Sequence, residues 1–273
     1  MGWFEAIVLG VVQGLTEFLP ISSTAHLLIL SQLFGWPDPG AAYSAVVQIG
    51  TEVAVLLYFR REIGQIVGAW SRSLVNADAR RDPNARMGWL ILIGTIPVAV
   101  FGILLRDQIE TAARNLYLVA AMLIVFGIIL ALADALGARR KDEHDITVRD
   151  GLVFGLAQAL ALIPGVSRSG ATISAGLAMG YTRAAAARYA FLLAVPAVLA
   201  SGIFEARKIG STTVAWGPTL VSTAIAFVVG YLVIAWLLRY LMTKSYLPFV
   251  IYRIAVGLIV LVLLGLGVLQ SGI

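Results

Sequence analysis

Apolar segments alternate with short polar or basic segments along the whole chain, and this pattern predicts its helices. A helix needs about 20 apolar residues to cross the hydrocarbon core of a bilayer. Segments of this length predict six transmembrane helices, at residues 41–59, 87–105, 116–136, 184–204, 216–238 and 247–269. The pattern therefore indicates an all-α integral membrane protein.

Four shorter apolar segments come in two pairs, at residues 3–18 and 23–34 and at residues 151–163 and 169–179. Each segment is too short to cross a bilayer alone. Each pair is interrupted by a polar break that contains a proline, Pro20 or Pro164, and proline disrupts a helix. Because non-helical backbone at membrane depth must be buried in protein or meet water, the pattern predicts two re-entrant helix pairs.

The two re-entrant pairs are similar in sequence. Residues 10–26 read GVVQGLTEFLPISSTAH, and residues 155–172 read GLAQALALIPGVSRSGAT. At one constant offset, Gln13 matches Gln158 and Ser22 matches Ser167. We therefore expect a single membrane domain with two halves, residues 1–138 and 150–273, and three spans in each half predict an inverted repeat. We also expect Gln13 and Gln158 to form a structural hydrogen bond across the repeats.

Composition and charge agree with a membrane protein and exclude some functions. Hydrophobic residues make up 60% of the 273 positions and charged residues 13%, whereas a soluble domain carries about a quarter charged residues. The formal net charge is +5, but the basic residues cluster in short segments between apolar ones, which is typical of cytoplasmic loops rather than nucleic-acid binding. The absence of cysteine excludes disulfides, a thiolate nucleophile and cysteine metal sites.

The basic segments also predict the orientation of the chain. Residues 60–86, 139–150 and 239–244 all lie on one side if there are six spans, and the positive-inside rule makes that side the cytoplasm. Both termini then face outward. The first re-entrant pair opens to the outer face, the second opens to the cytoplasm, and their tips meet inside the membrane.

The two polar breaks carry the candidate chemistry, because ionisable groups at membrane depth usually have a function. The planar donor fork of Arg168 suits phosphate oxygens, and serine hydroxyls at a helix start add neutral donors. A carboxylate beside a phosphate site implies a divalent cation, so Glu17 predicts a site for Mg²⁺ or Ca²⁺. Ser23 and His26 lie three residues apart, a spacing that suits a hydroxyl nucleophile with an adjacent base.

These residues resemble the motifs of a known family. Residues 13–17 match (E/Q)xxxE, residues 22–26 match SSTxH, and residues 164–172 match PGxSRSxxT, the motifs of the undecaprenyl-diphosphate phosphatases of the bacitracin-resistance type. The resemblance implies a multi-pass enzyme of the bacterial plasma membrane that hydrolyses undecaprenyl diphosphate to undecaprenyl phosphate and phosphate. This reaction recycles the lipid carrier of peptidoglycan synthesis. The resemblance also implies a divalent-cation requirement, an active site open to the outer face and a homodimer.

The residues and the resemblance together lead to a mechanism of metal-assisted phosphoryl transfer. Ser23 is the preferred nucleophile, with His26 as base or proton donor; His26 itself or metal-bound water are the alternative nucleophiles. Arg168 stabilises the charge of the transition state. Glu17 holds the cation with Gln13, which occupies the first acidic position of the motif. The expected substrate contacts are Ser22, Thr24, Ser167, Ser169 and Thr172.

Each of these residues also has a structural interpretation. The serines can cap helix starts, His26 can be a satisfied structural histidine, and Arg168 can form an ion pair with Glu17. A different function is also open, because inverted repeats with broken helices are typical of secondary transporters. A lipid-phosphate flippase would need a similar anion site.

Overall fold

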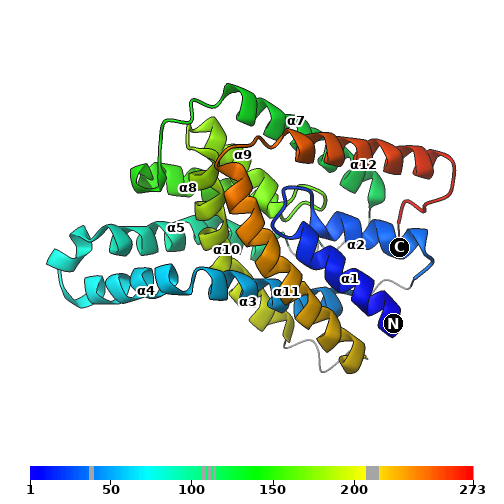
Figure 1. Cartoon of the computed structure of the whole chain (residues 1–273), viewed down its shortest axis with the longest axis horizontal. Coiled ribbons are helices and arrows are strands. Elements are labelled where there is room, and N and C mark those ends of the chain that lie inside the picture. The colour runs from blue at the N-terminus through cyan, green and yellow to red at the C-terminus, as the bar shows by residue number, and fades with distance from the viewer. Residues whose placement is uncertain (37–39, 106–107, 110–111, 113–114, 207–214, 273) are drawn as a thin grey trace.

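The computed structural model describes residues 1–36, 40–105, 108–109, 112, 115–206 and 215–272, without the side chains of residues 41, 42 and 201–206. Within these ranges the regular structure is helical, apart from one isolated bridge between Lys141 and Tyr181. The helices, drawn in Figure 1, are α1 (Trp3–Thr16), α2 (Ser23–Leu33), α3 (Gly40–Tyr58), α4 (Arg60–Val75), α5 (Pro83–Leu104), α7 (Leu116–Leu136), α8 (Val148–Leu160), α9 (Arg168–Ala178), α10 (Arg183–Ala206), α11 (Trp216–Leu241) and α12 (Leu247–Gly265).

Five of the described helices, α5, α7, α10, α11 and α12, are long and apolar enough to cross a membrane. These helices make the chain a multi-pass membrane protein. The apolar part of α3, Tyr43–Tyr58, is shorter, and it carries the polar residues Gln48, Thr51 and Glu52. The predicted all-helical membrane fold is thus confirmed, whereas the sixth span stays a prediction.

Residues 60–86 are largely helical, so the prediction of a loop there is wrong, whereas their cytoplasmic side stays a prediction. They form the amphipathic helix α4, the 3₁₀ turn Asp78–Arg81 and the start of α5, where the Asp82 carboxylate caps the helix by accepting from the Asn84 N–H at 2.8 Å. Ile66 and Ala69 are buried, while the arginines of α4 point outward. Helix α4 therefore has a charged face toward the outside and an apolar face that packs against α5.

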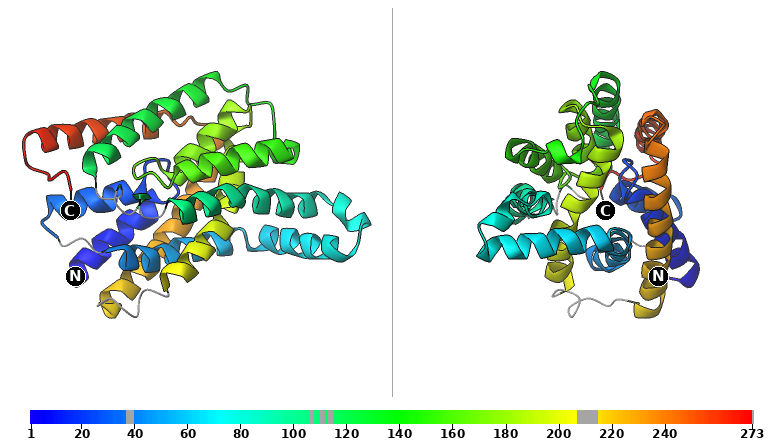
Figure 2. Two further views of the ribbon diagram at one scale, coloured as in Figure 1. Left: turned by 180° about the vertical axis from the view of Figure 1, so that it is seen from behind. Right: turned by 60° about the vertical axis from the view of Figure 1, so that its left-hand side comes forward.

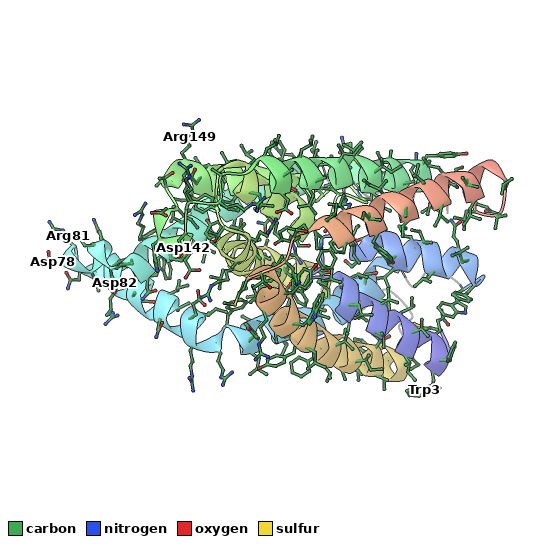
Figure 3. The ribbon with its side chains drawn as sticks, turned by 45° about the horizontal axis from the view of Figure 1, so that its top comes forward. Trp3, Asp78, Arg81, Asp82, Asp142 and Arg149 are labelled. Atoms are coloured by element: carbon green, nitrogen blue, oxygen red, sulfur yellow. The ribbon has the colours of Figure 1, made fainter. Side chains whose placement is uncertain are left out.

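The hairpin of α4 and α5 extends past the rest of the bundle at one end, and both termini lie toward the other end (Figures 1 and 2). Charged side chains gather toward the hairpin end: Asp78, Arg81 and Asp82 at its tip, and Asp142 and Arg149 nearby (Figure 3). Trp3 lies at the opposite end. The molecule is therefore polarised along its long axis.

The four short helices form where the breaks predict them. Helix α1 ends at Thr16 and α2 begins at Ser23, while α8 ends at Leu160 and α9 begins at Arg168. Pro20 and Pro164 lie in the turns between them. The observed ends differ from the predicted ends by up to three residues, because helix ends depend on local capping.

Glycines bring the short helices close to the long ones. A Cβ atom on Gly10 of α1 would lie 2.6 Å from the Ser222 carbonyl oxygen of α11, and one on Gly155 of α8 would lie 2.3 Å from the Gly94 carbonyl oxygen of α5. Neither position has room for a side chain. These two contacts fix α1 against α11 and α8 against α5.

One buried arginine joins both breaks. Arg253 of α12 is fully buried, and its Nη1 donates to the Pro20 carbonyl of the first break at 2.8 Å. Its Nη2 donates to the carbonyls of Gly165 and Val166 in the second break, both at 3.1 Å. Its Nε donates to the Leu123 carbonyl of α7 at 2.9 Å. The backbone of the two breaks is therefore held in one place by a single side chain that the sequence patterns do not single out.

Candidate active site

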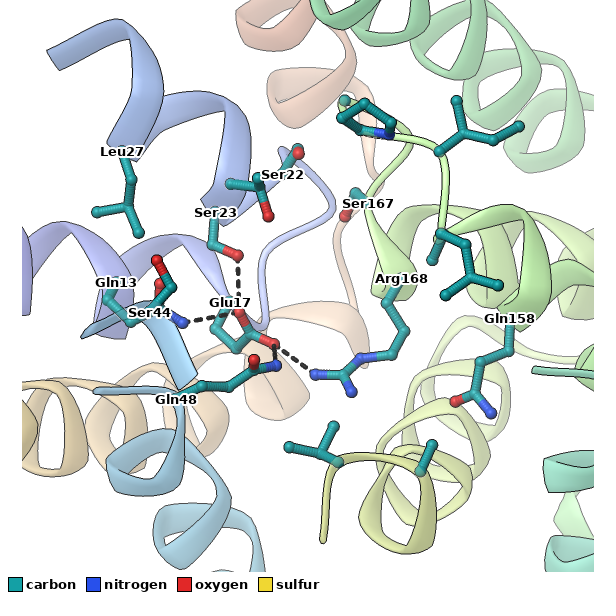
Figure 4. A pocket seen from close by; sticks show the side chains of 18 of the residues that line it. Gln13, Glu17, Ser22, Ser23, Leu27, Ser44, Gln48, Gln158, Ser167 and Arg168 are labelled. Atoms are coloured by element: carbon teal, nitrogen blue, oxygen red, sulfur yellow. Dashed lines mark hydrogen bonds and ion pairs between the residues drawn. The ribbon is translucent and has the colours of Figure 1, made fainter. Parts of the chain in front are cut away.

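A cavity of about 350 Å³ lies between the two breaks (Figure 4). Its first wall comes from α1, the first break, α2 and α3 and is mostly polar. Its second wall comes from α5, α8, the second break, α9 and α10 and is mostly apolar. The first wall consists of Gln13, Glu17, Ser22, Ser23, Thr24, Leu27, Leu28, Ser44 and Gln48. The second consists of Val98, Gln158, residues 161–165, Ser167, Arg168, Ala197 and Val198.

The Glu17 carboxylate is the centre of the polar contacts (Figure 4). Its Oε2 accepts hydrogen bonds from Ser23 Oγ at 2.7 Å and from Gln13 Nε2 at 2.9 Å. Its Oε1 accepts from Gln48 Nε2 at 3.3 Å and forms an ion pair with Arg168. A carboxylate at the C-terminal end of a helix opposes the helix dipole. These four donors offset that cost and fix the carboxylate against Ser23.

Ser22 and Ser167 cap α2 and α9 from equivalent positions, so the capping interpretation is confirmed. The Ser167 hydroxyl accepts from the Gly170 N–H at 3.2 Å, and the Ser22 hydroxyl contacts the Ala25 N–H at 3.5 Å. Both serines have φ of 72°, a left-handed conformation that is uncommon outside glycine and that clusters at functional sites. Both also line the cavity.

The caps bring two helix starts to the cavity. Ser23 is the first residue of α2, Arg168 is the first residue of α9, and both line the cavity. The free N–H groups and the positive end of the dipole at a helix start favour anions. The two breaks therefore form one site with donors suited to an anionic ligand.

Arg168 crosses from the second wall to two carboxylates. Its Nη2 pairs with Glu17 and also lies 3.5 Å from Oε1 of Glu52 on α3. The Glu52 side chain is 4% exposed, and its other oxygen, Oε2, is buried without a hydrogen-bond partner in the described part of the chain. The predicted ion pair of Arg168 with Glu17 is thus present, and a second carboxylate shares the same guanidinium nitrogen.

His26 is not among the residues that line the cavity, and in the described part of the chain it forms no hydrogen bond with Ser23. Its Nδ1 bonds to the Ser22 carbonyl at 2.7 Å, and its Nε2 bonds to the Tyr252 hydroxyl at 2.9 Å. Because a carbonyl oxygen only accepts, Nδ1 carries a proton, and in the neutral ring Nε2 therefore accepts from Tyr252. The two rings also stack, with centroids 5.5 Å apart. The group within hydrogen-bond reach of the Ser23 hydroxyl is therefore Glu17 rather than His26.

Two of the predicted substrate contacts also lie outside the cavity lining. Ser169 Oγ donates to the Leu19 carbonyl at 3.1 Å, and Thr172 Oγ1 donates to the Arg168 carbonyl at 2.7 Å. Both side chains are buried, and their bonds join the second break to the first and stabilise the start of α9. Ser22, Thr24 and Ser167 line the cavity as predicted.

Comparisons with known proteins agree with this geometry. The family model described as "Bacitracin resistance protein BacA" matches residues 6–259. The chain belongs to the BacA family. Among BacA-family relatives, "Undecaprenyl-diphosphatase 2" of Streptomyces coelicolor is 57% identical over 99% of this chain and 97% of the relative. "Undecaprenyl-diphosphatase" of Micrococcus luteus is 58% identical over 99% of this chain and all of the relative. The resemblance inferred from the motifs is therefore confirmed.

Some residues of this BacA-family site are absent from the two motif stretches. Ser44 and Gln48 line the cavity, and Glu52 lies behind Arg168. They follow one another at intervals of four in α3, which places them on one face of the helix. A polar face on an otherwise apolar helix is the signal that would have identified them.

Glu17 and the side chains around it also carry oxygen atoms of the kind that binds a hard cation. The carboxylates of Glu17 and Glu52, the hydroxyl of Ser23 and the amides of Gln13 and Gln48 all offer oxygen atoms, which Mg²⁺ and Ca²⁺ prefer. In the described ranges no three His, Cys, Asp or Glu side chains gather into a metal cluster. The residues of this BacA-family chain therefore fit a cation held by few carboxylates and completed by water or phosphate.

Proposed function

We propose that this protein is an undecaprenyl-diphosphatase, which hydrolyses undecaprenyl diphosphate to undecaprenyl phosphate and inorganic phosphate. BacA-family relatives with this name align with the chain over nearly their whole length. The observation that carries the proposal is the contact of Ser23 with Glu17 beside Arg168, in a cavity with one polar and one apolar wall. Such a cavity suits an anionic headgroup on an apolar chain.

In the proposed reaction, Ser23 Oγ attacks the terminal phosphorus while the bond to the bridging oxygen breaks. Glu17 accepts the serine proton, because its Oε2 lies 2.7 Å from the hydroxyl. The lipid leaves as its monophosphate, and water then hydrolyses the phosphoserine to release phosphate. Arg168 and the N–H groups at the starts of α2 and α9 stabilise the charge of the transferring group.

His26 holds the first break in place in this proposal. Its bonds to the Ser22 carbonyl and to Tyr252 occupy both ring nitrogens, which leaves neither free for the substrate. This arrangement favours Ser23 over His26 as the nucleophile. His26 as a proton donor would require it to exchange its bond to Tyr252.

We also propose that Mg²⁺ or Ca²⁺ takes part, held by Glu17 with Gln13. When bound, a divalent cation neutralises phosphate charge and polarises the phosphoryl group. The need for it follows from charge: the Glu17 carboxylate lines the cavity and would repel a diphosphate. Arg168 would then pair with the phosphate instead of Glu17.

For the topology, we propose α3 as the sixth span, the pairs α1–α2 and α8–α9 as re-entrant, and residues 1–138 and 150–273 as inverted repeats. Helix α1 of the first half packs against α11 of the second, and α8 of the second half packs against α5 of the first. This reciprocal packing supports the repeat, as do the equal φ values of Ser22 and Ser167. The plasma membrane of a bacterium, an active site open to the outer face and a homodimer complete the proposal.

The test is phosphate release by the purified protein in detergent micelles, where no transport can occur. The wild type should release inorganic phosphate from undecaprenyl diphosphate, and Ser23→Ala should lose this activity. Glu62→Gln is the control, because Glu62 pairs with Arg188 outside the cavity. A folded wild-type protein that binds the lipid without releasing phosphate would contradict the proposal and favour a lipid-phosphate transporter.

A further inference from the structure

Gln158 carries a buried amide without hydrogen bonds. It lies in the last turn of α8, its side chain is fully buried, and it lines the second wall of the cavity. Neither its Oε1 nor its Nε2 has a partner in the described part of the chain. The predicted hydrogen bond with Gln13 is absent, because Gln13 donates to Glu17 instead, and that prediction is wrong.

A buried amide that makes no hydrogen bond destabilises the fold unless a ligand satisfies it. Buried polar atoms of this kind therefore mark positions that a bound molecule completes. In Figure 4 the Gln158 amide lies beyond Arg168, on the side of the guanidinium away from Ser23. It belongs to the second wall, whereas Ser23 and Glu17 belong to the first.

The apolar residues of the cavity belong mainly to the wall that contains Gln158. Val98 of α5, Leu162 and Ile163 of the second break, and Ala197 of α10 belong to the same wall as Gln158. The cavity of about 350 Å³ is too small for a 55-carbon chain, so most of that chain must leave it. An isoprenyl chain would leave along this apolar wall, because apolar surface favours apolar contact.

We propose that Gln158 binds the phosphate that is linked to the lipid, an inference that rests on the proposed function. The phosphate under attack must lie beside Ser23 on the first wall. The lipid-linked phosphate then lies toward the second wall, between Arg168 and the chain. The Gln158 Nε2 group donates to an oxygen of this phosphate, and Oε1 accepts from its protonated form or from a bound water.

This assignment separates the two products. The lipid monophosphate retains the phosphate that Gln158 binds, whereas inorganic phosphate comes from the position beside Ser23. Loss of the amide should therefore weaken binding of the lipid diphosphate and of the lipid monophosphate, and it should leave the affinity for inorganic phosphate unchanged. A purely structural glutamine would not distinguish these three ligands.

The test uses Gln158→Met and Gln158→Leu in detergent, with farnesyl diphosphate as substrate. Farnesyl phosphate and inorganic phosphate are the competing inhibitors, and thermal unfolding reports the stability. Ser31→Ala is the matched control, because Ser31 Oγ is also buried without a partner but lies on α2 outside the cavity lining. The Gln158 variants and Ser31→Ala each remove a buried polar group without a partner in the described part of the chain, but only the Gln158 variants remove it from the cavity.

For both Gln158 variants we expect KM for farnesyl diphosphate and the inhibition constant of farnesyl phosphate to rise about tenfold, the effect of one hydrogen bond to a charged group. The inhibition constant of inorganic phosphate should stay within twofold, and the melting temperature should be unchanged or higher. Ser31→Ala should match the wild type in all kinetic constants.

Three results would overturn the proposal. They are an unchanged KM, an equal weakening of both inhibitors, or failure of both variants to fold, since an amide without partners is not needed for folding. The proposed function fails separately, if the wild type releases no phosphate. Phosphate release by the wild type together with an unchanged KM in the variants would leave the phosphatase assignment standing and remove Gln158 from the binding site.

Discussion

Replacing Arg168 by lysine keeps the positive charge and removes the planar fork. In the described part of the chain, Nη2 of Arg168 contacts Glu17 and Glu52, while no partner reaches its Nε and Nη1 atoms. One nitrogen therefore pairs with the carboxylates, and the others remain for phosphate. Lysine has a single nitrogen and cannot do both. We expect the Arg168→Lys variant to lose about 10²–10³ in kcat, the typical effect of one transition-state donor.

Stability should respond differently from rate. Glu52 is buried, and Arg168 is the group that contacts its carboxylate. Removing one partner of a buried ion pair costs about 3–5 kcal/mol, so Arg168→Ala should unfold at a clearly lower temperature. Arg168→Lys keeps the charge and should lose much less. Adding Glu52→Gln to Arg168→Ala should restore part of the stability without restoring activity, since it removes a buried acidic group that has lost its partner.

The assay combines single-turnover phosphate release with thermal unfolding in the same detergent. Arg188→Lys is the matched control, because Arg188 Nη2 pairs with Glu62 at 2.8 Å outside the cavity. The control should keep kcat within a few-fold of the wild type. Near-normal turnover by folded Arg168→Lys would remove Arg168 from the reaction, and a fall in stability equal to that of Arg168→Ala would refute the charge argument.

Two further predictions concern the cation and the sidedness. Gln13→Glu should keep activity and lower the Mg²⁺ or Ca²⁺ concentration needed for half-maximal rate, because a second carboxylate adds ligand charge. Loss of activity in a folded variant would show that the hydrogen bond from the Gln13 amide to Glu17 is essential. Because the chain has no cysteine, the exposed Asp78 and Ser271 can each be replaced by cysteine and labelled on intact cells with an impermeant maleimide. Ser271→Cys should react and Asp78→Cys should not, and the reverse pattern would place the first re-entrant pair toward the cytoplasm.

The sequence predicts the short helices and the breaks well because their signals are local. Proline, glycine and serine interrupt an apolar pattern at the residues where helices must stop, so α2 and α9 begin within one residue of the predicted positions. The meeting of Glu17 and Arg168 was also predictable, since the similar sequences of the two breaks predict an inverted repeat whose breaks meet. Opposite charges at membrane depth then have few other partners.

Sequence patterns did not predict the contacts that depend on how the helices pack against one another. Spacing predicts that Ser23 and His26 share a helix face, but the structure turns His26 toward Tyr252 of α12 and Ser23 toward Glu17 of the first break. Glu52 is remote from both motifs, and its role beside Arg168 follows from the packing of α3. Local patterns do not reveal such tertiary neighbours. For the same reason, the arginines at residues 60–72 suggested a loop, although this segment forms the amphipathic helix α4.

The bonds of Arg253 also limit how the molecule can move. A transporter with inverted repeats works by rocking one repeat against the other, which requires their central elements to separate. Here that separation would break the bond to Pro20 or the bonds to Gly165 and Val166, and a hydrogen bond from a charged donor is worth about 1.5–3 kcal/mol. The lost bonds would leave a buried charge without partners. The Arg253 guanidinium therefore opposes the motion that a carrier would need, and it keeps the two breaks together as a fixed site for the headgroup.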